Sequence, residues 1–299
     1  MKHRSHSRSL RLKTENSKLK TKKSLGQNFL RNAYYLALIA DAAHVMTGER
    51  VLEIGPGDGA LTAELLSRGA SVVAVEKDSR LIPVLREKFA KDIADKRLTL
   101  IEADALEFNP SDYQLTDKNP DAPKEAGTPT SRSERRGYKL VANIPYYITG
   151  ALLRKFLSET PRPSLLVFLV QKEVAQRIAR DKKESLLSLS VKAYGSPRYI
   201  KTVPRGAFSP APAVDSAILS VENISSDAFM NAAHEQRFFE LLHAGFAQKR
   251  KLLRRNVEKI LGSSALEALK RAGIPEKARA EDVPIEKWLV LAEGGKRDM

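Results

Sequence analysis

The stretch RVLEIGPGDGAL, residues Arg50–Leu61, decides the fold of this 299-residue chain. Its apolar run from Val51 to Ile54 predicts a buried strand. Glycines at positions 55, 57 and 59 predict a turn, and a helical pattern begins at Ala60. A strand, a glycine turn and a helix form one half of a βαβ unit. Glycine lets a ligand approach the backbone at a point where a Cβ atom would block it.

The glycine turn alone leaves several uses open, because such turns bind dinucleotides, phosphates or nucleosides, or only allow close packing. Its spacing is G-x-G-x-G and not the G-x-G-x-x-G of dinucleotide sites. A second apolar run, Val72–Val75, predicts another buried strand that ends in Glu76, 21 residues beyond Gly55. An acid at this separation can bind ribose hydroxyls, and the alternative is a solvated acid at the sheet edge. The two signals together favour a nucleoside cofactor.

The composition indicates a basic protein with a substantial core. Hydrophobic residues make up 42% of the chain, which is enough for one large or two modest domains. The 51 Lys and Arg outnumber the 36 Asp and Glu, and the net charge of +15 predicts attraction to a polyanion such as nucleic acid. No stretch approaches the roughly 18 apolar residues that span a bilayer, so we expect no membrane association.

The chain has no cysteine, which excludes disulfides, thiolate metal sites and a cysteine nucleophile. Its five histidines show no metal-ligand spacing, so we expect tail, cap or surface positions for them and no metal site. These histidines are His3, His6, His44, His234 and His243.

Residues 1–23 are polar, with nine Lys or Arg and a single acid, Glu15. We expect a basic disordered tail that adds electrostatic affinity for nucleic acid. An organellar transit peptide is the alternative, since the segment is rich in Arg and Ser and poor in acids. Too few apolar residues are present for an amphipathic helix, which favours the tail.

Asn28 and Leu30 lie in the unusual segment Ser24–Leu30, just before a helix predicted over 34–45. The commonest use of such an asparagine is in a loop or a helix cap. The functional alternative is a segment that folds over the ligand, in which Asn28 forms a hydrogen bond and Leu30 packs on the ligand. Composition alone leaves both uses open.

Asp104 follows the third predicted strand, which covers 98–101. Ligands of an open parallel sheet bind beyond the carboxyl ends of the strands, where this carboxylate can accept a hydrogen bond from the adenine amine. A turn or capping aspartate is the alternative. From 111 to 137 the sequence is polar with charges of both signs, and we expect a mobile surface insertion without chemistry.

A fourth predicted strand, 138–142, runs into the most specific stretch of the chain, Asn143-Ile144-Pro145-Tyr146. The exocyclic amine of adenine is a poor nucleophile because its lone pair is delocalised into the ring. The Asn143 side-chain oxygen and the Ile144 carbonyl can bind both amine hydrogens and free that lone pair. Pro145 stiffens the turn, and Tyr146 can stack on a flipped base. An ordinary Asn-Pro turn with a core tyrosine is the alternative.

The remaining elements before residue 226 follow similar apolar patterns. We predict strands over 165–170, 199–203 and 216–221, and helices over 173–180 and 185–193. A proline-rich loop carries Phe208, which is either a core residue or the second face of a base sandwich with Tyr146.

The composition changes after Ser226, and short helical patterns follow. The predicted helices cover 238–246, 252–261, 265–272 and 285–292. Five basic residues gather at the start of the second of these helices. A charge run is usually a solvated face, but in a chain this basic a helix that contacts phosphates is at least as good an interpretation. The five are Lys249, Arg250, Lys251, Arg254 and Arg255.

Taken in order, these motifs resemble those of the ribosomal RNA adenine dimethyltransferases, the small-subunit methylases that use S-adenosylmethionine. The resemblance runs from about Ser24 to Ala292, and as an ordered set the motifs are highly specific. Two features depart from the family pattern: the insertion is long, and Arg180–Leu189 lacks a Gly-Tyr-Gly-like loop. The motifs are LGQNFL, LEIGPGDGALT, VVAVEKD, EADAL, VANIPYYIT, FSPAPAVDSAIL and GFAQKRKLLRRN.

The resemblance implies an α/β fold, the Rossmann-like class I methyltransferase fold with a seven-stranded, mostly parallel sheet and a small C-terminal α-helical domain. It also implies dimethylation of N6 on two adjacent adenosines near the 3′ end of small-subunit (16S) rRNA, with S-adenosylmethionine as cofactor. The cofactor contacts would fall on Asn28, Leu30, Gly55, Gly57, Glu76, Asp104 and Asn143. The catalytic residues would be Asn143, Ile144, Pro145, Tyr146 and Phe208.

We therefore expect a basic tail (1–23), a methyltransferase domain (24–223) and a helical RNA-binding domain (224–299). The expected protein is a cytoplasmic monomer whose partner is small-subunit rRNA or a pre-30S particle. One alternative is a large-subunit (23S) rRNA adenine methyltransferase that confers antibiotic resistance. Another is a non-catalytic RNA-binding assembly or transcription factor on the same fold, and a nicotinamide-dependent dehydrogenase is a more distant third.

Overall fold

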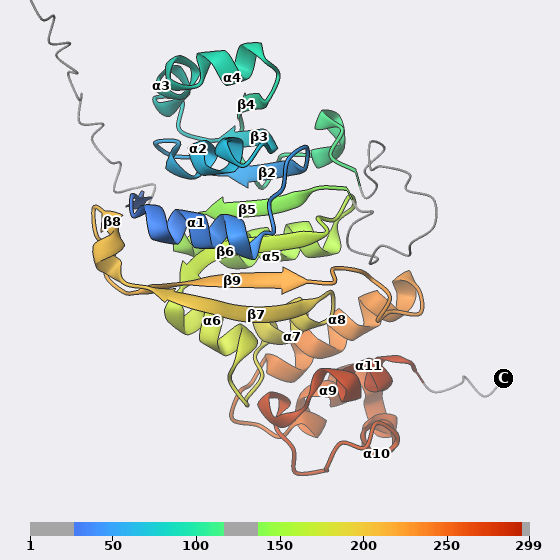
Figure 1. Cartoon of the computed structure of the whole chain (residues 1–299). Coiled ribbons are helices and arrows are strands. Elements are labelled where there is room, and N and C mark those ends of the chain that lie inside the picture. The colour runs from blue at the N-terminus through green and yellow to red at the C-terminus, as the bar shows by residue number, and fades with distance from the viewer. Residues whose placement is uncertain (1–26, 117–136, 295–299) are drawn as a thin grey trace, which may run out of the picture.

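A mixed β-sheet forms the centre of the protein (Figure 1). The computed structural model describes residues 27–116 and 137–294. In sheet order the seven strands are β4 (Leu98–Glu102), β3 (Ser71–Glu76), β2 (Arg50–Ile54), β5 (Lys139–Asn143), β6 (Leu165–Gln171), β9 (Ser216–Glu222) and β7 (Ser196–Val203). The first five strands in this order run parallel, whereas β9 pairs antiparallel with both β6 and β7. This arrangement confirms the predicted fold class.

Helices cover both faces of the sheet, which explains why its central strands are continuous apolar runs. Val51 and Leu52 of β2 belong to two separate apolar cores, one on each face. Side chains of the first helices fill one core, and those of later helices fill the other. The first group is α1 (Ala33–Ala42), α2 (Ala60–Ser67), α3 (Leu81–Lys88) and α4 (Ala90–Ala94). The second group is α5 (Thr149–Ser158), α6 (Lys172–Ala179) and α7 (Leu186–Lys192).

The C-terminal helices pack beside β7 and against α7, at the end of the sheet away from β4 (Figure 1). Phe238 and Trp288 are fully buried and belong to the same apolar core as the side chains of α5, α6 and α7. The predicted domain boundary at 223/224 remains a prediction. The helices are α8 (Ala232–Phe246), α9 (Leu253–Leu261), α10 (Ala265–Arg271) and α11 (Ile285–Ala292).

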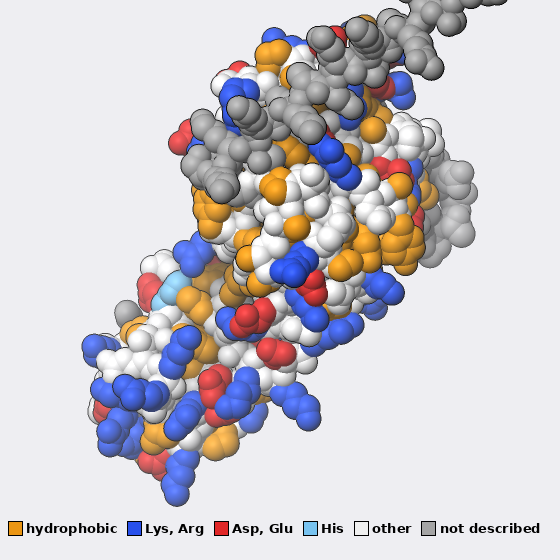
Figure 2. Space-filling model, turned by 90° about the vertical axis from the view of Figure 1, so that its left-hand side faces the viewer, with side chains coloured by type: hydrophobic (Ala, Val, Ile, Leu, Met, Phe, Trp, Pro, Cys, Tyr) orange, Lys and Arg blue, Asp and Glu red, His pale blue; other side chains and the backbone are white. Residues whose placement is uncertain are grey.

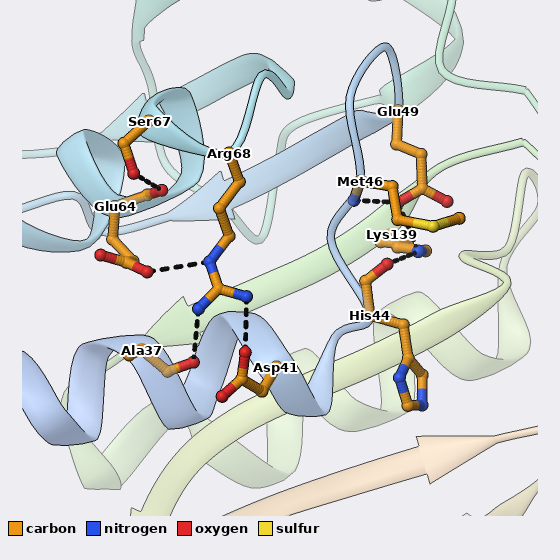
Figure 3. A network of polar contacts seen from close by, with 9 residues as sticks. All are labelled: Ala37, Asp41, His44, Met46, Glu49, Glu64, Ser67, Arg68 and Lys139. Atoms are coloured by element: carbon orange, nitrogen blue, oxygen red, sulfur yellow. Dashed lines mark hydrogen bonds and ion pairs between the residues drawn. The ribbon is translucent and has the colours of Figure 1, made fainter.

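Two basic side chains fix α1 over the sheet (Figure 3). The Arg68 guanidinium, at the end of α2, donates to the Ala37 carbonyl at 3.1 Å and pairs with Asp41 at 2.6 Å. From β5, the Lys139 ammonium donates to the His44 carbonyl at 2.6 Å. Since α1 directly follows residues 28–30, these contacts also position that segment.

The structure differs from the sequence-based prediction in several elements. Helices α4 and α5 were not expected, although Leu152, Leu153 and Phe156 of α5 are buried at helical spacing. Helix α8 begins at Ala232 and not at residue 238. Two short strands, β1 (Phe29–Leu30) and β8 (Phe208–Ser209), pair with each other and were also missed. Their pairing joins segments far apart in the chain, so neither carries a local signal.

One expectation about surface residues is wrong. The predicted insertion begins as a packed segment, because Tyr113 of the 3-10 turn η2 (Pro110–Tyr113) stacks on Phe108 and Leu115 is fully buried. His234 is a buried residue in the first turn of α8, where its Nδ1 accepts from the Met230 N–H and its Nε2 contacts the Leu289 carbonyl, so of the expected positions it has the capping one. Residues 117–136 of the insertion and the tail 1–23 lie outside the described residues.

Candidate active site

One cavity lies at the carboxyl ends of strands β2 to β5, where an open parallel sheet binds its ligands. It has a volume of about 1030 Å³ including its open mouth. All residues predicted for the cofactor and the target base line this cavity. They are Asn28, Leu30, Gly55, Gly57, Glu76, Asp104, Asn143, Ile144, Pro145, Tyr146 and Phe208.

The glycine turn forms the floor of the cavity. Gly57 has a φ of +61°, and a Cβ there would lie 2.9 Å from the Phe29 ring. The turn therefore lets the segment with Asn28 close tightly over it. Gly59 has a different role, since its added Cβ would meet Phe89 at 2.5 Å and it does not line the cavity. Gly55 and Gly57 shape the site, and Gly59 serves helix packing.

Glu76 ends β3 inside the cavity and is only 7% exposed, so it is not a solvated acid at a sheet edge. Its carboxylate accepts hydrogen bonds from the Gly57 N–H at 3.2 Å and the Asp78 N–H at 2.8 Å. Burial raises the pKa of Glu76, and these backbone hydrogen bonds oppose that rise. The two N–H groups hold the carboxylate in a fixed orientation beside the glycine turn.

Asp104 lies beyond the end of β4, and its contacts show the turn position that was one of the two alternatives. One carboxylate oxygen accepts from the Leu106 N–H at 2.9 Å, which makes it a turn residue. The other accepts from the Lys77 ammonium at 2.5 Å, and this hydrogen bond lowers the pKa of Asp104. Both Asp104 and Lys77 line the cavity, so a charged acceptor is exposed to the cavity.

Asn143 ends β5, and its side-chain amide donates to the Asn28 carbonyl at 3.4 Å. This contact uses the NH₂ group and leaves the side-chain oxygen to accept from a ligand. Ile144 is buried, and Pro145 caps the 3-10 turn η3 (Tyr146–Ile148). The end of β5 therefore presents the Asn143 oxygen in the same cavity as the two acids.

Tyr146 and Phe208 reach the cavity from different parts of the chain. The Tyr146 hydroxyl is hydrogen-bonded to the Ser216 hydroxyl at 2.6 Å, and burial raises the pKa of Tyr146. Phe208 of β8 is paired with Leu30 of β1 and is 7% exposed. Phe208 is thus a core residue that also lines the cavity, whereas the sequence had offered a core position and a base-binding position as separate alternatives.

Several further polar residues of the cavity were given no role by the sequence, among them Lys77, Tyr147 and Glu53. Lys77 and the exposed Tyr147 directly follow predicted site residues, so position in the motif could have indicated them. Glu53 lies within the apolar run of β2 and is 1% exposed. Its Oε2 atom accepts a hydrogen bond from the Thr62 hydroxyl at 2.7 Å.

The predicted RNA-binding residues lie together, on the turn between α8 and α9 and on the first turn of α9. Four are exposed, whereas Arg254 is partly buried and pairs with Glu276 at 3.3 Å. Asn256 holds this turn, because its buried amide donates to the Gly245 carbonyl at 2.6 Å and the Gln248 carbonyl at 3.2 Å. Figure 2 shows many Lys and Arg side chains on this lower part of the molecule.

The segment that departs from the family pattern, Arg180–Leu189, is tied to the C-terminal helices. The Glu184 N–H donates to the Glu281 carbonyl at 2.8 Å, and the Lys183 ammonium pairs with the Glu281 carboxylate at 2.5 Å. Ser185 and Ser188 form a capping box that starts α7. These contacts give the loop a structural role, since they join it to the C-terminal part of the chain.

Two negative findings concern the described residues, 27–116 and 137–294. No group of three or more His, Asp or Glu side chains among them could hold a metal ion. Within the same residues, no helix has the length and apolar composition required to cross a bilayer.

The strand order, the hairpin of β9 and β7, and the cavity at the carboxyl ends define a class I methyltransferase, the class that uses S-adenosylmethionine. Within this class the chain belongs to the ribosomal RNA adenine dimethylase family, whose model matches residues 18–294.

Individual relatives agree with this assignment. The ribosomal RNA small subunit methyltransferase A of Dehalococcoides mccartyi is 41% identical over 277 residues, which cover 91% of this chain and 88% of the relative. The crystal structure of the 23S rRNA methyltransferase ErmE has 28% identity and a TM-score of 0.66, and the match covers 89% of this chain and 98% of ErmE. A dimethyladenosine transferase from Plasmodium falciparum has 24% identity and a TM-score of 0.70, and covers 88% of this chain and 95% of its own. This last likeness supports the fold alone.

Proposed function

We propose that this protein transfers two methyl groups from S-adenosylmethionine to N6 of each of two adjacent adenosines near the 3′ end of small-subunit rRNA. The observation that carries the proposal is the position of the Asn143–Tyr146 turn, in the same cavity as the glycine turn and the acids of β3 and β4. The relative that is 41% identical bears the name of a small-subunit methyltransferase, which supports the choice of substrate.

The charges of the cavity suit this cofactor. Among the described residues, four carboxyl groups line it, against one ammonium group, that of Lys77. When bound, S-adenosylmethionine supplies a methyl group on a positively charged sulfur. Asp104 accepts a hydrogen bond from the adenine amine, and Glu76 accepts from the ribose hydroxyls. The four acids are Glu53, Asp58, Glu76 and Asp104.

The end of β5 activates the target base. The free side-chain oxygen of Asn143 and the carbonyl of Ile144 accept the two hydrogens of the adenine amine. This draws the nitrogen toward a tetrahedral geometry, in which its lone pair is available for attack. No general base is needed, because the nitrogen sheds a proton to water once it is methylated. Catalysis then depends on alignment of nitrogen, methyl and sulfur.

Tyr146 and Phe208 hold the extruded base from its two faces. The hydrogen bond between the Tyr146 and Ser216 hydroxyls fixes the tyrosine ring, and pairing of β8 with β1 fixes Phe208. Asn28 directly precedes β1, and β1 pairs with β8. One small sheet therefore joins the base clamp, which is Tyr146 and Phe208, to the cofactor segment, residues 28–30.

RNA binding is assigned to the basic turn at 249–255 and to the C-terminal helical domain, 224–299. Exposed Lys and Arg side chains at this turn can neutralise RNA phosphates on contact. The net charge of +15 attracts RNA over longer distances. The basic tail, 1–23, adds to this attraction. We propose a cytoplasmic monomer that acts on small-subunit rRNA or on a pre-30S particle.

The test is to incubate small-subunit particles from a methylase-lacking strain with the protein and labelled cofactor, and to analyse the rRNA by mass spectrometry. Two adjacent dimethyladenosines near the 3′ end are expected. The main alternative is methylation of large-subunit rRNA, because the structurally similar ErmE is a 23S rRNA methyltransferase. Primer extension across both rRNAs separates the two, and stops only in the large subunit would refute the proposal. A non-catalytic RNA-binding protein would transfer no label to either rRNA.

A further inference from the structure

Glu53 is a buried carboxyl group that none of the roles above explains. It lies one residue before the end of β2, lines the cavity and is 1% exposed. Its Oε2 atom accepts from the Thr62 hydroxyl, but its buried Oε1 atom has no hydrogen-bond partner among the described residues. A buried polar atom without a partner is costly, so this oxygen calls for a donor that enters the cavity with a ligand.

We propose that Oε1 of Glu53 binds the α-ammonium group of S-adenosylmethionine, and that Glu53 gives up a proton to the solvent as the cofactor binds. The inference rests on the proposed function and extends it, since it names the residue that recognises the amino-acid end of the cofactor.

The order of the strands supplies the geometric argument. Along β4, β3, β2 and β5 the cavity presents Asp104, Glu76, Glu53 and Asn143 in turn. Adjacent strands lie about 4.8 Å apart. With adenine at Asp104, ribose at Glu76 and the target amine at Asn143, the methionyl part lies over β2. Glu53 is opposite Ala74 of β3 and Val141 of β5, midway between the ribose and the reacting methyl.

Hydrogen-bond chemistry selects the ammonium group within that methionyl part. The sulfonium has no N–H or O–H to donate, and the carboxylate only accepts. The ammonium has three donors and a positive charge, which matches a buried acceptor that can become an anion.

The surroundings keep Glu53 protonated until such a cation arrives. Burial raises the pKa of Glu53 to about 8, although the Thr62 hydrogen bond opposes the rise. The charged groups that act on it are Glu76 on β3 and Asp58 in the glycine turn, which raise its pKa, and Lys88 on α3, which lowers it. An ammonium group beside the carboxyl favours the ionised form, so binding at neutral pH releases the proton.

Isothermal titration calorimetry of the whole protein at pH 6.5, in phosphate and in imidazole buffer, measures this proton. S-adenosylmethionine should release close to one proton, and its affinity should rise about tenfold per pH unit between pH 6 and 7. The cofactor ammonium stays protonated there, since an α-amino group titrates near a pKa of about 7.7–8.0. 5′-Methylthioadenosine, which lacks the amino-acid part, should bind without proton release.

A pair of variants assigns the proton to its residue. Glu53→Gln should bind S-adenosylmethionine about 10- to 100-fold more weakly at pH 7.5, with no proton release and a flat affinity between pH 6 and 7. Asp58→Asn is the matched control, since it removes another cavity carboxyl that is partly exposed and faces Arg31. This control should keep the release.

Several results would overturn the inference. Equal proton release by Glu53→Gln would do so, as would equal release with both ligands by the unmodified protein, a comparison that needs no variant to fold. Binding of S-adenosylmethionine without any proton release would refute the role of Glu53 and leave the proposed function standing. No binding of S-adenosylmethionine at any pH would refute both.

Discussion

Asn143→Ala should slow methyl transfer about 100- to 1000-fold and change the affinity for S-adenosylmethionine little. The substitution removes the side-chain oxygen that accepts from the reacting amine, and loss of one such transition-state hydrogen bond costs about 2.7–4 kcal/mol. The Asn143 backbone carbonyl, which lies beside the glycine turn, is retained. The contact of its amide with the Asn28 carbonyl is long, at 3.4 Å, so stability should fall by less than about 1 kcal/mol.

The assay is single-turnover transfer of labelled methyl groups to small-subunit particles, combined with calorimetric titration of the cofactor. Asn109→Ala is the control, because Asn109 caps η2 outside the cavity and its loss should leave the transfer rate unchanged. A rate for Asn143→Ala within threefold of the unmodified protein would refute the role of this side chain. Weakened cofactor binding in proportion to the lost rate would assign Asn143 to the cofactor alone.

Three further predictions concern other parts of the chain. Arg68→Ala should lower the free energy of unfolding by about 1 kcal/mol in chemical denaturation, because α1 loses its links to α2. Arg97→Ala removes a partly exposed ion pair with Asp92 and should cost less. Asn256→Ala should leave two carbonyls of the basic turn unpaired, cost about 1–3 kcal/mol of stability and weaken RNA binding in a filter assay, and unchanged RNA affinity would contradict the role of that turn. Glu53 has a folded pKa of about 8 against an ordinary 4.5, so its contribution to stability is complete below pH 4.5 and is lost as the pH rises to 8. Urea unfolding of the cofactor-free protein should therefore show a loss of up to about 3 kcal/mol between pH 5.5 and 8 that Glu53→Gln lacks.

The central strands of the sheet were predictable because they are apolar on both faces, and continuous apolar runs are strong signals. Helix α5 was missed although its buried residues Leu152, Leu153, Phe156 and Leu157 have helical spacing. It directly follows the turn that begins with the Asn-Ile-Pro-Tyr motif. Leu115 is a lone apolar residue in polar sequence, and nothing local indicates that it is buried.

The cavity was predictable because its motifs follow neighbouring parallel strands, whose carboxyl ends meet at one edge of the sheet. The contacts within it were not. The bonds from Thr62 to Glu53, from Lys77 to Asp104 and from Asn143 to the Asn28 carbonyl depend on side-chain positions in three dimensions. The same holds for the pairing of β1 with β8, which joins the cofactor segment to the base clamp.

The most direct test of the central claim is a structure of the protein with S-adenosylmethionine and an RNA fragment that carries the target adenosines. We predict that the extruded adenine lies between Tyr146 and Phe208, with its N6 within hydrogen-bond distance of the Asn143 side-chain oxygen and the Ile144 carbonyl and in line with the methyl and sulfur. An adenine whose N6 points away from the methyl, or whose amine contacts other side chains, would contradict the account.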